Sequence, residues 1–307
     1  MITSLVGYTG FVGSNIAQKN NFTYLYNSKN IESAYDTQPD LLIYSGVRAE
    51  KYLANQYPDQ DYKLVEEAFE NIKKIRAKKV VLISTIDVYK MPVNVDEDTV
   101  IDIKNLQPYG LNRFYLEKWI ENEYENSLII RLPGLFGDNI KKNFIYDMIH
   151  KIPNLLKEEK YNELRSINSV IDNYYINQNN GFFKCKDLSN EECIILKDYF
   201  EKIGFSALNF TDSRGKFQFY NLNFLWEHIS IALKENIKSL NLATEPVSIN
   251  EIYKYITGNN FVNQISSIIP NYDFKTKYEA LFRGKTGYIF SKEKVLEDIK
   301  LFVEENI

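Results

Sequence analysis

Three glycines spaced three residues apart near the N-terminus limit what this chain can fold into more than any other feature. Gly7, Gly10 and Gly13 follow a short apolar run at residues 2–6 and precede a helix expected at residues 14–19. The first glycine permits a tight turn, the second lets the backbone approach a pyrophosphate, and the third lets the helix pack closely on the strand. The helix N-terminus would then hold the anion. Ordinary turns also contain closely spaced glycines, so a plain turn is the alternative to a dinucleotide site.

Apolar segments of strand length alternate with helical patterns through the first half of the chain. We expect strands at residues 22–26, 40–44, 79–85 and 127–131, and helices at residues 62–76 and 111–124. Strands that alternate with helices form parallel sheets, whose ligands lie beyond the carboxyl ends of the strands. The sequence therefore predicts the α/β class, with a Rossmann-type doubly wound parallel sheet.

The regular alternation weakens after about residue 143 and returns near residue 216. We expect a Rossmann domain over residues 1–150 and a smaller, mainly substrate-binding region over 151–307, with residues 216–234 returning to the Rossmann domain. Within the smaller region, the polar segment 157–180 predicts helix and loop. Residues 216–222 predict one strand.

The end of the second expected strand bears on the choice between NAD and NADP. An acidic residue there would bind the ribose hydroxyls of NAD, and none is present at residues 27–29. Ser28 and Lys29 could instead meet a 2′-phosphate, which favours NADP weakly, although a solvated loop position for Lys29 is an equal alternative. Arg48 and Lys51 could contact a cofactor phosphate, but surface charge is the simpler interpretation.

Composition and charge exclude several classes of protein. The chain has 307 residues and a net charge of −4, with no dominant basic patch, which argues against a nucleic-acid partner. Its two cysteines lack metal-ligand spacing, so we expect no metal site and a reducing compartment. The sequence has no leader and no long apolar run, which predicts a soluble, cytoplasmic protein without a membrane partner.

Several segments, in this order, resemble the extended short-chain dehydrogenase/reductase family, in its group of nucleotide-sugar epimerases, dehydratases and reductases. The segments that carry the resemblance are Gly7-x-x-Gly10-x-x-Gly13, Ser84-Thr85-Ile86-Asp87-Val88-Tyr89, Pro108-Tyr109-Gly110, Arg131-Leu132-Pro133-Gly134-Leu135-Phe136-Gly137, and the stretches 217–222 and 240–248. They cover most of the chain outside about residues 157–209. The resemblance implies a nicotinamide cofactor and a nucleotide-sugar substrate.

The same resemblance assigns roles to individual residues. Tyr109 would exchange a proton with a sugar oxygen as hydride moves, and Thr85 would orient that oxygen. The cofactor would contact Gly7, Gly10, Phe11, Val12, Gly13, Ser28, Lys29, Gly46 and Pro133. Arg214 would bind the nucleotide diphosphate, since a guanidinium suits bidentate capture of phosphate.

Position 113 departs from the family pattern. A phenol with a pKa of about 10 is a poor base near neutrality and needs a nearby cation, and Arg113 stands where the family has lysine. One helical turn still places this cation on the face of Tyr109, but a guanidinium is bulkier and does not release its proton. Three interpretations remain: an active enzyme using Arg113, an active enzyme with a different or relocated acid/base, or a protein that binds its ligand with little turnover.

The reaction predicted is epimerisation or keto reduction. Some dehydratases of the family carry an Asp-Glu pair directly after the hydroxyl residue, and Ile86 and Asp87 stand there instead. Dehydration is therefore disfavoured. The alternative from another class is a non-catalytic dinucleotide-binding sensor or scaffold of a sugar pathway. A homodimer through the helix that bears Tyr109 is also implied by the resemblance.

Overall fold

The structure is a computed structural model that describes residues 1–306. The chain forms two compact units, a first unit of residues 1–140, 216–248 and 270–299, and a second unit of residues 141–215, 249–269 and 300–306. The last helix, α10 (Lys292–Asn306), runs from the first unit into the second.

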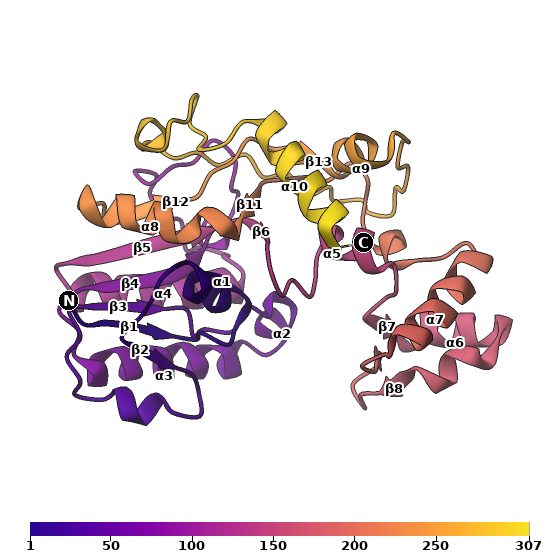
Figure 1. The fold of residues 1–307 in the computed structure, drawn as a ribbon, viewed down its shortest axis with the longest axis horizontal. Helices are drawn as coiled ribbons and strands as arrows, with labels where there is room; N and C mark the ends of the chain where they lie inside the picture. Colours follow the sequence, from indigo (N-terminus) through magenta and orange to yellow (C-terminus); the bar gives the residue numbers. More distant parts are fainter. Residues whose placement is uncertain (307) are drawn as a thin grey trace. The chain divides into compact units, whose positions relative to one another are not determined.

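A six-stranded, all-parallel sheet forms the centre of the first unit. Its strand order is β2-β1-β3-β4-β5-β12 (Figure 1). The strands are β1 (Thr3–Val6), β2 (Tyr24–Tyr26), β3 (Leu41–Tyr44), β4 (Val80–Thr85), β5 (Ser127–Leu132) and β12 (Ser239–Asn241). The chain runs from β1 out to β2 and then returns past β1 to β3, so the order reverses at β1. Such a reversal opens a crevice at the carboxyl ends of the neighbouring strands.

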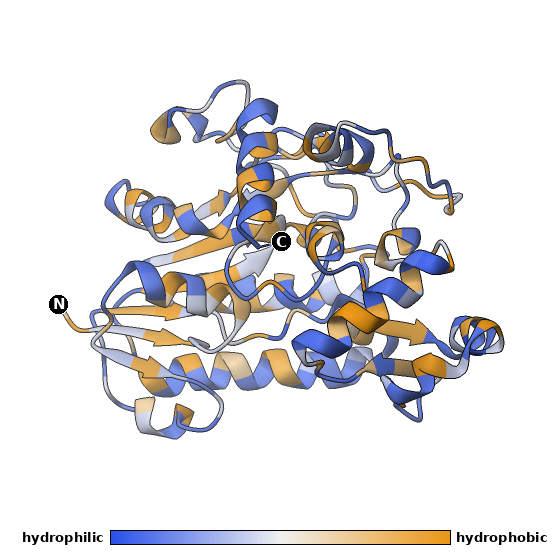
Figure 2. Ribbon diagram, turned by 45° about the vertical axis from the view of Figure 1, so that its right-hand side comes forward, coloured by the Kyte–Doolittle hydropathy of each residue, from blue (hydrophilic) through white to orange (hydrophobic). Residues whose placement is uncertain are grey.

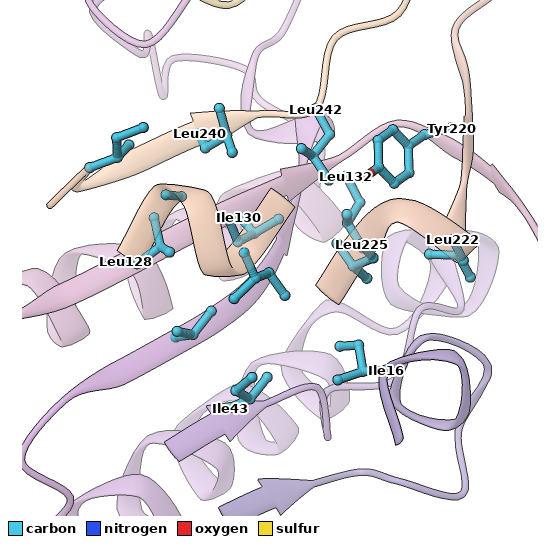
Figure 3. Packing of buried hydrophobic residues seen from close by; sticks show 14 of the residues in the cluster. Ile16, Ile43, Leu128, Ile130, Leu132, Tyr220, Leu222, Leu225, Leu240 and Leu242 are labelled. Carbon is cyan, nitrogen blue, oxygen red and sulfur yellow. The ribbon is translucent and has the colours of Figure 1, made fainter. Parts of the chain in front are cut away.

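Helices cover both faces of this sheet, because successive strand residues point to opposite sides. One face packs on α1 (Phe11–Lys19) and α8 (Leu225–Lys234), and the other on α3 (Pro58–Ile75) and α4 (Pro108–Glu123). In Figure 1, α8 and α3 lie on opposite sides of the sheet. Figure 3 shows Ile43 and Ile130 of the sheet packed with Ile16 of α1 and Leu225 of α8. The predicted doubly wound Rossmann-type fold is confirmed.

Smaller elements complete the first unit. They are α2 (Lys51–Gln56), β6 (Gly134–Phe136), β10 (Lys216–Phe217), β11 (Phe219–Asn221), β13 (Val247–Ser248) and the 3₁₀ turns η1 (Ile31–Ala34), η2 (Ile86–Val88), η5 (Leu222–Phe224) and η6 (Glu279–Phe282). β11 pairs with β6, and β10 pairs with β13.

The segment expected as one strand at residues 216–222 is two strands in different sheets. Gln218 separates them, and its buried side chain donates to the carbonyl oxygens of Thr244 and Phe274 and accepts from the Phe274 N–H. A buried amide held from three sides fixes the chain where it changes sheets, since an unsatisfied amide would be costly there. The apolar pattern of the segment is continuous across this residue and did not reveal the break.

The second unit has its own sheet and its own core. The antiparallel order is β7-β9-β8, formed by β7 (Leu155–Lys157), β8 (Tyr175–Asn177) and β9 (Phe182–Cys185). The remaining elements are α5 (Phe144–His150), α6 (Glu158–Ile167), η3 (Ser169–Asn173), α7 (Asn190–Lys202), η4 (Ala207–Phe210) and α9 (Ile249–Thr257). The buried cluster includes Leu156, Leu164, Ile171, Leu196 and Phe200.

The prediction of helix and loop for residues 157–180 agrees with α6 but missed β8, and the other two strands lie at and beyond the ends of that segment. Each has only three or four residues, too few for an alternating pattern to stand out. The Asn-rich stretch is the turn between β8 and β9, where Gly181 has a φ of +82°. Figure 2 shows hydrophobic residues along the central strands of the first unit and mixed colouring on the helices. No helix within residues 1–306 is both long and apolar enough to cross a membrane.

Candidate active site

The glycine turn lies at the carboxyl end of β1, where the strand order reverses. Gly7 has a φ of +89°, which L side chains rarely adopt, and a Cβ at Gly13 would lie 2.1 Å from the Gly7 carbonyl oxygen. These two positions therefore require glycine. The turn is fixed to β2, because the Gly7 N–H donates to the carbonyl of Tyr26 at 2.7 Å.

Helix α1 begins at Phe11, directly after Gly10, and so starts three residues earlier than expected. Among the described residues, no side chain caps this end of the helix. Phe11 and Val12 are its first two residues and are partly buried against the core, while Thr9 and Gly10 are exposed. The N-terminal N–H groups at this exposed turn suit an anion such as a pyrophosphate. The cradle thus fits a dinucleotide.

Residues after β2 and β3 lie on either side of this turn. A Cβ at Gly7 would come within 2.7 Å of the Ser45 backbone, so Ser45 and Gly46 border the turn directly. Ser28 and Lys29 are exposed and follow Tyr26 within three residues. The structure therefore brings the glycine turn, Gly46 and the Ser28-Lys29 pair to one part of the sheet edge.

Thr85 and Tyr109 come together at the same edge of the sheet. Thr85 ends β4, and Tyr109 is the second residue of α4. Gly110 explains how closely α4 approaches η2, because a Cβ there would lie 2.0 Å from the Asp87 carbonyl oxygen. The Tyr109 side chain is buried, and the Thr85 side chain lies close enough to lower the pKa of its phenol.

The Tyr109 phenol is not activated in this structure. Burial raises the pKa of Tyr109 and is the largest effect, while Arg113, the Thr85 side chain and the charge of Lys51 lower it. The nearby Asp87 carboxylate raises the pKa further. The pKa of Tyr109 therefore lies above the ordinary value of a phenol, and ionisation of Tyr109 depends on how the surrounding charges are balanced.

Arg113 is engaged by groups other than the phenol oxygen. Its guanidinium forms a buried ion pair with Asp61 of α3 and donates to the carbonyl oxygens of Tyr109 and Arg48 at 3.3 and 2.6 Å. The guanidinium carbon lies 4.0 Å from the centre of the Tyr109 ring, over the face of the ring. Arg113 thus joins α3, α4 and the loop before α2.

A second cation lies near Tyr109 and comes from outside its helix. Lys51 Nζ lies 2.8 Å from Asp87 Oδ1 and 3.3 Å from the Tyr272 hydroxyl, which donates to the same carboxylate at 3.1 Å. The sequence-based prediction for Lys51 was a surface charge, and Tyr272 had no predicted role. The sequence signal for this group of side chains is Asp87, because it stands two residues after Thr85 and therefore near the carboxyl end of β4.

Pro133 lies between β5 and β6, at the carboxyl end of β5. Arg131, two residues before Pro133, is buried and pairs with Glu117 of α4, which also accepts from Ser84. Arg131 additionally donates to the Tyr89 hydroxyl at 2.8 Å. This buried network ties α4 to β4 and β5 behind the site.

Arg214 belongs to the second unit, where Asp212 already occupies much of its guanidinium. Nε and Nη2 of Arg214 donate to the two carboxylate oxygens of Asp212 at 3.0 and 2.8 Å, and Nη2 also donates to the Ser266 carbonyl. The Arg214 side chain holds the pKa of Asp212 well below its usual range. The site expected for a diphosphate is therefore an internal ion pair in this structure.

Comparison with known proteins adds information at the level of the fold. No protein-family model matches the sequence, and no curated protein matches it.

Several solved structures match over almost the whole chain. A dTDP-4-dehydrorhamnose reductase from Bacillus anthracis in complex with NADP is 15% identical, with a TM-score of 0.64 and 99% of each chain covered. A UDP-glucose 4-epimerase from Thermotoga maritima with UDP-glucose is 14% identical, with a TM-score of 0.63 and 99% of this chain and 98% of that chain covered. The Bordetella bronchiseptica enzyme WbmG with NAD and UDP is 12% identical, with a TM-score of 0.65 and coverages of 99% and 94%. The chain therefore has the fold of the extended short-chain dehydrogenase/reductases that act on nucleotide sugars.

Proposed function

We propose that this protein is an NAD(P)-dependent enzyme that modifies a nucleotide-activated sugar, as an epimerase or a keto-reductase. One observation carries the proposal: the Tyr109 phenol and the Thr85 hydroxyl meet at the sheet edge that also bears the glycine turn. A proton-transferring group and a dinucleotide cradle at one edge suit hydride transfer. The structural neighbours solved with NADP, NAD, UDP and UDP-glucose support the same class of ligands.

Tyr109 and Thr85 would handle the proton. In oxidation, the Tyr109 phenolate takes the proton of a sugar hydroxyl while the carbon loses hydride, and in keto reduction the phenol returns that proton to the oxygen. Thr85 would hold the reacting oxygen against the phenol. A bound nicotinamide accepts or supplies the hydride. Gly7, Gly13 and the start of α1 would hold the pyrophosphate.

The finer assignments belong to the same proposal. Ser28 and Lys29 would give a weak preference for NADP, and Arg214 would bind the nucleotide diphosphate after leaving Asp212. The first unit would bind the cofactor and the second unit the sugar, in a cytoplasmic protein. A homodimer through α4, the helix that bears Tyr109, is part of the same proposal.

The test is turnover with a panel of nucleotide sugars and both cofactors, followed by nicotinamide absorbance and product mass. Tyr109→Phe should lower the rate about 10²- to 10⁴-fold, the usual contribution of a proton-transferring group. Tyr115→Phe is the matched control, since it removes a hydroxyl from the same helix and should leave the rate unchanged. A Tyr109→Phe variant with full activity would exclude the mechanism.

A non-catalytic sensor or scaffold is the second candidate function. It is favoured by Arg113, because the hydrogen bonds described for its guanidinium go to Asp61 and to two backbone carbonyls. Cofactor binding with no turnover on any sugar would support this candidate. A protein that binds neither NAD nor NADP would exclude both functions.

A further inference from the structure

Helix α2 is attached to the first turn of the helix that bears Tyr109. The Asn55 side chain accepts a hydrogen bond from the Tyr109 N–H at 2.9 Å. Lys51 lies one turn earlier in α2, so it shares a face with Asn55. The anchor at Asn55 therefore directs Lys51 towards the Tyr109 end of α4.

Two partners fix the Lys51 ammonium at that end. Asp87 accepts from Lys51 at 2.8 Å and from the Tyr272 hydroxyl at 3.1 Å, while its own N–H donates to the Thr85 hydroxyl oxygen. The backbone of Asp87 touches Gly110, the residue next to Tyr109. The three side chains form a cluster, Lys51–Asp87–Tyr272, beside the phenol.

The charges that face the phenol come from three elements. Arg113 of α4 favours ionisation of Tyr109 most strongly, Asp87 of η2 opposes it, and Lys51 of α2 favours it with a smaller effect. Arg113 is balanced by Asp61 of α3 inside the protein. Lys51 has 48% of its side chain exposed and pairs directly with the carboxylate that opposes ionisation.

We propose that Lys51 is the positioning residue that stabilises the Tyr109 phenolate, by neutralising Asp87 and adding a cation from outside the tyrosine helix. The proposal rests on the proposed function for its catalytic meaning, but the charge effect on Tyr109 can be measured without turnover. It assigns to α2 the role that a lysine four residues after Tyr109 would otherwise have. Without the Lys51 ammonium as its partner, the Asp87 carboxylate would keep the Tyr109 phenol protonated.

The direct test is a titration of Tyr109 by ¹⁹F NMR. The full chain is labelled with 3-fluorotyrosine, whose phenol ionises at lower pH, and the Tyr109 resonance is the one missing from Tyr109→Phe. Lys51→Met should raise the midpoint by about half a unit to one unit, and Asp87→Asn should lower it, because one change removes a cation and the other an anion. Lys78→Met, which breaks a 2.8 Å pair with Asp40, is the control and should leave the midpoint unchanged.

The outcomes separate this proposal from the proposed function. If Lys51→Met and Asp87→Asn shift the midpoint in opposite directions, the charge role stands, whether or not a sugar turns over. If Lys51→Met leaves the midpoint within about 0.2 units, the proposal is wrong even when Tyr109→Phe abolishes turnover. With turnover, the alkaline limb of the pH–rate profile should move with the same sign as the midpoint.

Discussion

Two cation–carboxylate pairs flank Tyr109, and they differ in their access to water. Arg113 and Asp61 have only 5% and 7% of their side chains exposed, and backbone carbonyls complete the coordination of the guanidinium. Lys51 and Asp87 have 48% and 21% exposed. A buried pair with further backbone partners fixes the positions of helices, whereas an open, solvent-accessible pair can respond to a ligand.

This difference has an energetic consequence. Removing one partner of a buried pair leaves an uncompensated charge in a poorly polarisable interior, whereas water replaces the lost partner of an exposed pair. We therefore assign the stability of the Tyr109 region to Arg113 and Asp61, and the adjustment of the phenol to Lys51 and Asp87.

The largest expected effect is on the buried pair. Asp61→Ala should lower the free energy of unfolding by about 3–5 kcal/mol, because the Arg113 guanidinium stays buried without its carboxylate. Urea denaturation followed by circular dichroism measures the change. Glu70→Ala is the control, since it removes an exposed pair with Lys73 on the same helix, α3, and should cost under about 1 kcal/mol. Equal losses in the two variants would remove the distinction between buried and open pairs.

His228, a buried base, provides a further test of the difference between buried and exposed ionisable groups. His228 is enclosed by aromatic rings and hydrogen-bonds Tyr220 at 2.7 Å, and burial lowers the pKa of His228 to about 4. The unfolded chain binds this proton near pH 6.5, so the contribution to stability is complete above pH 6.5 and is lost as the pH falls towards 4.

Lowering the pH from 7 to 5 should therefore reduce the contribution of His228 to the free energy of unfolding by about 2 kcal/mol. Urea denaturation at both pH values, compared with His228→Gln, isolates this contribution because the variant lacks the titrating ring. His150→Gln, at the exposed second histidine, is the control. An unchanged acid slope in His228→Gln would mean that other groups cause the loss.

Replacing the guanidinium by an ammonium should have an intermediate effect. Arg113→Lys retains the charge near Asp61 but cannot make the same set of hydrogen bonds to the Arg48 and Tyr109 carbonyls, at a cost of about 1–2 kcal/mol. Denaturant unfolding measures the loss, and turnover should not rise. A tenfold gain in turnover would show instead that position 113 limits catalysis.

The smallest expected effect on stability is at the open pair. Lys51→Met should change the free energy of unfolding by less than about 1 kcal/mol, because water solvates Asp87 once the ammonium is gone. The same denaturation curves provide the measurement. A loss as large as that of Asp61→Ala would show that Lys51 is structural and that its effect on Tyr109 is secondary.

The fold was predictable because its signals are local. Strands β3 and β4 carry uninterrupted apolar runs at residues 41–44 and 80–83, and the glycines that need special backbone geometry, Gly7 and Gly13, lie in one short turn. The short strands of the second unit were missed because three residues do not define a period.

The charge arrangement at the site was not predictable, because its partners are remote in sequence. Arg113 meets Asp61 from 52 residues away, and Tyr272 meets Asp87 from 185 residues away. Position 113 was recognised as unusual, but only the fold shows that its guanidinium bonds backbone carbonyls of two segments. The distance between the partners, and not the residue types, hid the cluster.

The hydrogen bond from Arg113 to the Arg48 carbonyl couples position 113 to other segments of the chain. Asp61 and the backbone at Arg48 and Tyr109 accept from this one side chain. A mutation at position 113 is therefore epistatic with the loop before α2 and with position 61. Because an ammonium cannot reach all three acceptors at once, the effect of Arg113→Lys should depend on which residue stands at position 61.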